Sequence, residues 1–104
     1  IDLGGPFKSS VYATAPGVVT YAGWKGKYGK LVEIDHGAGL KTRYGHLHKF
    51  FVKKGQKVNF HKKIGLLGST GRSTGAHLHY EVVFKGRAKN PMKFIRAGKY
   101  VFQE

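Results

Sequence analysis

The sequence predicts an all-β fold in which a mostly antiparallel β-sheet folds into a sandwich or an open barrel. Two observations support this prediction: short apolar or alternating runs along the chain, and 16 glycines within 104 residues. Runs that alternate between apolar and polar residues are typical of half-buried strands, and glycines permit the tight turns that join them. A sheet of this kind must protect its edges, and folding back on itself does so.

Four runs are the clearest strand candidates, and they lie at residues 18–21, 31–35, 40–46 and 77–84. Each is rich in β-branched, aromatic or alternating residues. The segment 36–39 (HGAG) has the length and glycine content of a hairpin loop. We therefore expect the second and third runs to pair as an antiparallel hairpin.

The remaining elements are shorter. Residues 53–56 (KKGQ) separate two further apolar runs at 50–52 and 58–60. A loop rich in serine, threonine and glycine fills 65–75, just before the last strand candidate. Only 91–97 is expected to hold a helical turn or two. The chain shows no repeat and no linker, so it is predicted to form one domain over residues 1–104.

Composition excludes several classes of protein. Hydrophobic residues make up 40% of the chain, so it is expected to be globular. There is no cysteine, which excludes a disulfide framework and a thiolate metal site. The net charge of +14 favours contact with a polyanion: nucleic acid, anionic lipid or an acidic wall polymer. The alternative is that the charge serves solubility and weak nonspecific adhesion.

The segment His77-Leu78-His79-Tyr80-Glu81 is the sharpest local feature. In a strand, His77, His79 and Glu81 share one face. Two imidazoles on the same side of a strand can converge on one metal ion, and neutral imidazole is the commonest zinc ligand. A His-x-His pair by itself is more often structural.

A second strand candidate also carries histidine. Alternation predicts that Thr42, Tyr44, His46 and His48 share a face. One interpretation is a polar face that meets solvent. The other is that sheet pairing brings His46 to the first two histidines as a general base or transition-state donor, with Tyr44 adding a donor.

Asp2 is an acid in an apolar setting, between Ile1 and Leu3. A buried carboxylate without a partner is costly, so Asp2 requires a cation, a metal or exposure to solvent. From these residues alone, exposure is the simpler interpretation.

Together these segments resemble the lysostaphin-like (LytM-type) zinc endopeptidases, over nearly the whole chain and in the family's order. The matching segments are Asp2 followed by 4–6 (GGP), then 15–19 (APGVV), 28–32 (YGKLV), 42–47 (TRYGHL), 52–58 (VKKGQKV) and 68–81 (GSTGRSTGAHLHYE). The resemblance implies that Asp2 and His79 bind Zn²⁺. It implies that His46 and His77 are catalytic.

One family position is missing from the sequence. The family's first zinc histidine stands four residues before the aspartate, and the sequence begins at Ile1. We therefore expect the domain to be N-terminally incomplete and its present form to be weak or inactive, with His77 as a possible third ligand. The alternative is a degenerate relative that binds cell wall or activates a wall amidase without cutting.

The resemblance further implies the reaction and its setting. The expected reaction is hydrolysis of peptide cross-links in peptidoglycan, with the substrate extended in a groove along the sheet. The cross-link is either an oligoglycine bridge or a D-amino-acid linkage, and the expected location is extracytoplasmic. A monomer is expected, with anionic wall polymers or a membrane surface as further partners of the basic charge. A basic barrel specific for nucleic acid is the weaker rival, because it explains neither Asp2 nor the His-x-His pair.

The other histidines receive simpler interpretations. We expect His36 to be structural, and His48 and His61 to lie at the surface. Glu81 is expected either to orient a histidine or to form a plain ion pair. The glycine-rich loop lacks the spacing of a phosphate-binding P-loop, and no His-Glu-x-x-His helix is present.

Overall fold

The computed structural model describes residues 2–71, 75–89 and 102–103 of the chain. The helical turns expected at 91–97 lie outside the described residues. The strands are β1 (Asp2–Gly4), β2 (Ser10–Tyr12), β3 (Gly17–Trp24), β4 (Lys30–Gly37), β5 (Leu40–Phe50), β6 (Lys57–Val58), β7 (Lys63–Leu67), β8 (His77–Phe84), β9 (Arg87–Lys89) and β10 (Phe102–Gln103). Within the described part of the chain, one short 3₁₀ turn, η1 (Gly26–Tyr28), is the only helical element.

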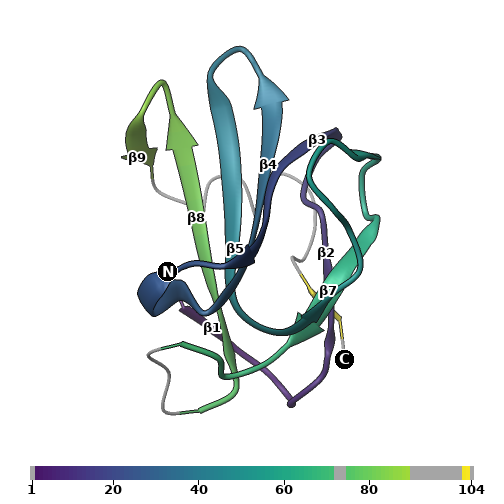
Figure 1. Cartoon of the computed structure of the whole chain (residues 1–104), viewed down its shortest axis with the longest axis vertical. Helices are drawn as coiled ribbons and strands as arrows, with labels where there is room; N and C mark the ends of the chain where they lie inside the picture. The colour runs from purple at the N-terminus through teal and green to yellow at the C-terminus, as the bar shows by residue number, and fades with distance from the viewer. Residues whose placement is uncertain (1, 72–74, 90–101, 104) are drawn as a thin grey trace.

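All strands belong to one antiparallel sheet. Its main path runs β10-β2-β7-β5-β4-β3-β6, and β8 pairs with β1, β5 and β9 beside that path. Figure 1 shows the sheet curling, with β8 and β9 on one side and β2 and β7 on the other. The predicted all-β, antiparallel fold is confirmed, and its form is a half-barrel.

Strand β5 produces the curl because it changes partners along its length. Residues Leu40 to Gly45 pair with β8, whereas Leu47 to Phe50 pair with β7. Its other edge pairs with β4 from Leu40 to Leu47. Since β5 carries a different neighbour on each half, it turns from one wall of the half-barrel into the other.

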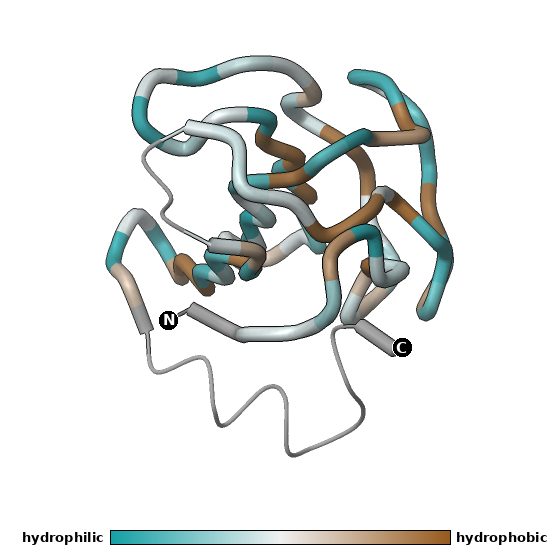
Figure 2. The backbone as a smooth tube through the Cα atoms, turned by 90° about the horizontal axis from the view of Figure 1, so that it is seen from below, coloured by the Kyte–Doolittle hydropathy of each residue, from teal (hydrophilic) through white to brown (hydrophobic). Residues whose placement is uncertain are grey.

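The core fills the inside of this curl. Figure 2 shows hydrophobic segments gathered toward the middle of the molecule and hydrophilic ones at its turns. Burial of each large aliphatic side chain contributes about 1.5–3 kcal/mol relative to its exposed state. The largest fully buried side chains are Tyr44, Tyr80, Leu31, Ile34, Leu47, Ile64, Leu67, Leu78, Val11, Val19, Val32 and Val82.

A network of hydroxyl groups crosses this core. The Tyr44 hydroxyl lies 2.8 Å from Thr42 Oγ1 and 3.0 Å from Thr14 Oγ1, and Thr14 Oγ1 lies 3.0 Å from the Tyr80 hydroxyl. His36 joins it through Nε2, 2.7 Å from Thr42 Oγ1. Burial raises the pKa of both tyrosines, so both remain protonated donors. The structural role predicted for His36 is confirmed.

Most of the predicted strands exist with extended bounds. The strand predicted at 77–84 has the same bounds as β8, and the expected hairpin joins β4 to β5 through Ala38 and Gly39. The strand predicted at 50–52 is wrong beyond Phe50, where β5 ends. Of the strand predicted at 58–60, only Val58 lies in a strand, β6. No helix in the described segments has the length and apolar character needed to cross a membrane.

Candidate functional site

His46 enters the site through a bulge in β5. Lys30 pairs with Leu47 and Val32 with Tyr44, so Leu31 alone faces both Gly45 and His46. The extra residue is His46, whose φ of 61° lies in the left-handed region that side chains rarely adopt. The bulge re-aims the His46 side chain away from the face that strict alternation would give it.

The bulge overturns one prediction. Tyr44 does not share a face with His46: it is fully buried, and its hydroxyl is bound within the core network. Tyr44 therefore adds no donor to the histidines. The prediction was wrong because alternation holds only along an unbroken strand.

Strand β8 carries the other two histidines. His77 and His79 are half-buried, whereas Leu78 and Tyr80 between and beside them are fully buried in the core. The alternation predicted for this strand is confirmed. Because β5 and β8 pair side by side, the ring centroid of His46 lies 5.0 Å from that of His77 and 5.9 Å from that of His79.

Hydrogen bonds fix which nitrogen of each ring carries a proton. His46 Nδ1 lies 2.6 Å from the Thr70 carbonyl oxygen, and His77 Nδ1 lies 2.9 Å from the Gly75 carbonyl oxygen. A carbonyl oxygen can only accept, so both Nδ1 atoms donate. In the neutral rings the lone pair then resides on Nε2. His79 is the reverse: its Nε2 lies 3.0 Å from Glu81 Oε2, which leaves the lone pair on Nδ1.

Glu81 is the anchor of His79. The Tyr28 hydroxyl donates to Glu81 Oε1 at 3.0 Å, and Arg43 Nη1 donates to the same oxygen at 3.4 Å. Burial alone would raise the pKa of Glu81, but the hydrogen bonds from His79, Tyr28 and Arg43 outweigh it and lower the pKa. Burial and the neighbouring carboxylate raise the pKa of Tyr28. Glu81 therefore both orients a histidine and forms an ion pair.

Thr70 holds the site from the opposite side. Its hydroxyl donates to the Leu47 carbonyl at 2.7 Å and accepts from the Lys30 amide at 3.0 Å, while its own carbonyl accepts from His46. Thr70 thus ties the glycine-rich loop to β4 and β5. Sequence reasoning assigned no role to Thr70, Tyr28 or Arg43, because each acts through contacts between segments far apart in the chain.

Asp2 approaches the site through its backbone. The register pairs Asp2 with His79 and Gly4 with His77 across β1 and β8. The position of the Asp2 side chain lies outside what the structure describes. Across the described residues, no group of three or more histidine, aspartate or glutamate side chains has the arrangement of a metal site.

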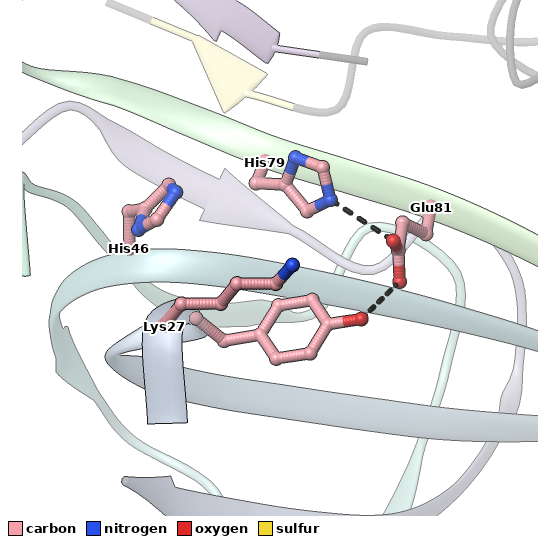
Figure 3. Close-up of a pocket in the computed structure, with 5 residues that line it drawn as sticks. Lys27, His46, His79 and Glu81 are labelled. Carbon is pink, nitrogen blue, oxygen red and sulfur yellow. Dashed lines mark hydrogen bonds and ion pairs between the residues drawn. The ribbon is translucent and has the colours of Figure 1, made fainter. Parts of the chain in front are cut away.

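The side chains enclose a cleft of about 260 Å³, lined by Lys27, Tyr28, His46, His79 and Glu81. In Figure 3, His79 lies between His46 and Glu81, and the Lys27 side chain extends below these three residues toward the middle of the view. Two oriented imidazoles beside a third that a carboxylate holds are suited to proton transfer and to metal binding.

The other two histidines lie elsewhere. His48 packs edge-on against Phe7 with a centroid separation of 4.9 Å, and His61 stacks on Tyr12 at 4.3 Å. Both are half-buried against aromatic rings, so the surface positions expected for them are only partly correct. Neither lines the cleft.

Comparison with known proteins agrees with this arrangement. The sequence model described as "Peptidase family M23" matches residues 1–91. The peptidoglycan DD-endopeptidase ShyA of Vibrio cholerae is 48% identical over 92 residues, which are 88% of this chain and 21% of that protein. The chain therefore spans about a fifth of the length of this curated relative.

Solved structures show the same fold. A zinc-containing peptidase from Vibrio cholerae shares 43% identity and a TM-score of 0.84, over 88% of this chain and 28% of that one. The catalytic domain of lysostaphin from Staphylococcus simulans shares 33% identity and a TM-score of 0.85, over 91% of this chain and 76% of that one. By sequence match, fold and the clustering of its histidines, the chain belongs to peptidase family M23.

Proposed function

We propose that this domain is a zinc-dependent endopeptidase that hydrolyses peptide cross-links in bacterial peptidoglycan. The observation that carries the proposal is the convergence of His46, His77 and His79 beside one cleft. A polar face that only meets solvent gives no reason for three imidazoles to converge from neighbouring strands. Residues 1–104 are proposed to act as one peptidase domain.

The donor set suits zinc. Glu81 holds His79 through Nε2, which is the arrangement in which a carboxylate orients a metal-binding histidine and raises its basicity. Directly opposed residues of an antiparallel pair share a face of the sheet, so the register of Asp2 with His79 supports Asp2 as the second ligand. A zinc ion held there supplies Lewis-acid polarisation of the scissile carbonyl.

His46 and His77 are proposed to perform the acid–base chemistry. Each donates through Nδ1 to a backbone carbonyl, so each presents Nε2 as the nitrogen that accepts a proton from the attacking water. Once protonated, the same nitrogen becomes a donor. It then stabilises negative charge on the carbonyl oxygen and returns the proton to the leaving amine.

The substrate determines the setting. Peptidoglycan lies outside the cytoplasm, so we propose an extracytoplasmic location: periplasm, wall or medium. The net charge of +14 supports additional contact with anionic wall polymers or a membrane surface. We propose that the domain acts as a monomer and recognises no specific nucleic acid.

The test compares two proteins on purified cross-linked peptidoglycan. One is the 104-residue chain, and the other carries a short N-terminal extension that places a histidine four residues before Asp2. We expect the extended form to release cleaved cross-links, to lose this activity on chelation and to regain it with zinc. The shorter chain should be at least about 10- to 100-fold weaker, since even outer-shell losses cost that much.

Two results would count against the proposal. Equal rates from both proteins would show that the zinc site is misassigned. Zinc binding by the extended form without any cleavage would identify a module that binds wall without cutting it.

A further inference from the structure

A second cleft adjoins the histidines. It has a volume of about 510 Å³ and is lined by Trp24, Gly26, Lys27 and Gly71. Lys27 also lines the first cleft, so the two share a wall. A chain that lies across the histidines reaches the second cleft by passing Lys27.

The backbone beside this second cleft is tightly packed at two glycines. Gly29 has a φ of 69° and Gly71 a φ of 75°. A Cβ on Gly29 would stand 2.5 Å from the Gly71 amide nitrogen, and a Cβ on Gly71 would stand 2.5 Å from the Lys27 carbonyl oxygen. The turn that carries Lys27 therefore packs directly, backbone against backbone, on the loop that holds Thr70.

The turn is also closed on itself. The Tyr28 amide donates to the Lys25 carbonyl at 3.0 Å, and the Lys25 amide donates to the Gly29 carbonyl at 2.9 Å. Trp24 precedes it and is 59% exposed. The second cleft therefore presents the Trp24 ring and the Lys27 side chain, and the turn between them is held by its own hydrogen bonds.

Lys27 is the uncompensated charge in this region. Glu81 is the one acidic side chain along either cleft, among the residues described, and it is already held by His79, Tyr28 and Arg43. Figure 3 shows the Lys27 ammonium group directed into the first cleft beside these side chains. No ion pair of Lys27 occurs within the described segments.

We propose that the cleft between Trp24 and Gly71 binds part of a peptide substrate whose free carboxylate reaches Lys27 at the wall shared with the first cleft, with Lys27 as its counter-ion. This inference rests on the proposed peptidase function and narrows its substrate. A cross-link with a carboxylate close to the scissile amide satisfies Lys27. A neutral oligoglycine bridge leaves the lysine unpaired and offers Trp24 no side chain to cover it. The cleft therefore favours a linkage flanked by a carboxylate over a neutral oligoglycine bridge.

The test measures binding of three synthetic peptides that share one D-amino-acid linkage. The first carries a side-chain carboxylate and an amidated C-terminus, the second a free C-terminus and an amidated side chain, and the third is amidated at both places. Titration calorimetry or NMR gives Kd for each peptide without requiring turnover. The preference for one acid over the other identifies which carboxylate Lys27 recognises.

Wild-type protein is expected to bind one acidic peptide about fivefold more tightly than the fully amidated one, as befits a solvent-accessible pair. Lys27→Gln should abolish this preference. Lys25→Gln is the matched control: it removes the same charge two residues away, from a lysine that lies over the Tyr21 ring and lines neither cleft. Trp24→Ala should weaken all three peptides alike. The preference should shrink in 0.5 M salt, where the screening length falls to a few ångströms.

Loss of the preference in Lys25→Gln as much as in Lys27→Gln would overturn the proposal, because general attraction to the basic domain would then explain it. So would equal binding of all three peptides, or of none, by the wild type. In the extended form that carries a histidine four residues before Asp2, a preserved preference without cleavage would leave the carboxylate site standing and refute the peptidase function instead.

Discussion

Strands β5 and β8 carry two polar networks that differ in what surrounds them. On the core side, Tyr44, Tyr80, Thr14 and Thr42 bond to one another with no access to solvent at the tyrosines. On the cleft side, histidines bond outward to backbone carbonyls and to Glu81 and keep a lone pair directed elsewhere. The first network is bonded mainly within itself, and the second orients the imidazole rings of the histidines.

Because the surroundings differ, we expect the core network to affect folding stability and the histidine network to affect the reaction. A closed buried network costs free energy when one member is removed, because its partners remain buried without hydrogen bonds. His77 and His79 are half-buried, and His46 is 7% exposed but lines the open cleft, so the loss of a cleft-side histidine should affect the reaction more than folding. The β5 bulge at His46 creates this separation, since it places neighbouring residues of one strand in different networks.

The largest expected effect is on the cleft side. His46→Ala or His77→Ala should reduce cross-link cleavage by about 10²- to 10⁴-fold, the usual contribution of a positioned general acid or base. The midpoint of thermal unfolding should move little. Activity on purified peptidoglycan and calorimetry of the same samples check this. Unfolding of either variant at much lower temperature would show that the histidines are structural.

Thr70 lies between the two extremes, because it holds His46, the histidine proposed to be catalytic, and does not line the cleft itself. Thr70→Val removes the hydroxyl that binds Leu47 and Lys30 and should lower activity about 10-fold, in the range measured for outer-shell partners. Thr70→Ser keeps the hydroxyl and is the control. The two variants should differ in kcat, and equal activity would remove Thr70 from the site.

The core side should show the opposite pattern. Tyr44→Phe removes the acceptor of the Thr14 amide and the bond that the Thr42 hydroxyl donates to Tyr44, and it should cost about 1–3 kcal/mol of unfolding free energy. Tyr21→Phe, which removes an exposed hydroxyl, should cost less than about 0.5 kcal/mol. Denaturant unfolding measures both. Activity per folded molecule should remain close to wild type, and a selective loss of activity in Tyr44→Phe would break the comparison.

The smallest effect belongs to the pair of Glu33 and Arg43, which supports the anchor of His79 from behind. Burial alone would raise the pKa of Glu33. The 2.6 Å hydrogen bond from Arg43 and the bond from Thr20 have the larger combined effect, so the pKa of Glu33 is lowered. Because the folded pKa lies below the unfolded value near 4.3, the stabilisation is present above that value and is lost as pH falls through the folded pKa.

The free energy of unfolding of the wild type should therefore exceed that of Glu33→Gln by at most about 1 kcal/mol near neutral pH, and the difference should shrink as pH falls through the folded pKa of Glu33. Unfolding in urea across this pH range gives the two curves. A difference that persists at acid pH would show that Glu33 acts through packing and not through its charge.

Much of this arrangement was predictable from local patterns. Alternation in β8 placed His77 and His79 on one face with Leu78 and Tyr80 in the core, and the four-residue glycine loop predicted the β4–β5 hairpin. The position of His46 was expected, but for the wrong geometric reason, since alternation would have put it beside Tyr44. A bulge depends on how two strands pair, and one strand's sequence does not determine it.

The supporting contacts were beyond reach for the same reason. Thr70 is 24 residues from His46 in the chain, and Tyr28 is 53 residues from Glu81. Only the assembled sheet brings them together. The role of Arg43 as a partner of two carboxylates follows only from the strand register, which sets it opposite both Glu33 and Glu81.

We propose that the three clustered histidines divide their work, with His79 holding zinc and His46 and His77 moving protons. Zinc content per chain of the three single alanine variants, each in the form with a histidine four residues before Asp2, tests it most directly. We predict that His79→Ala loses zinc, whereas His46→Ala and His77→Ala retain close to one equivalent although all three lose cleavage. Retention of zinc by His79→Ala, or its loss from His46→Ala, would contradict the division.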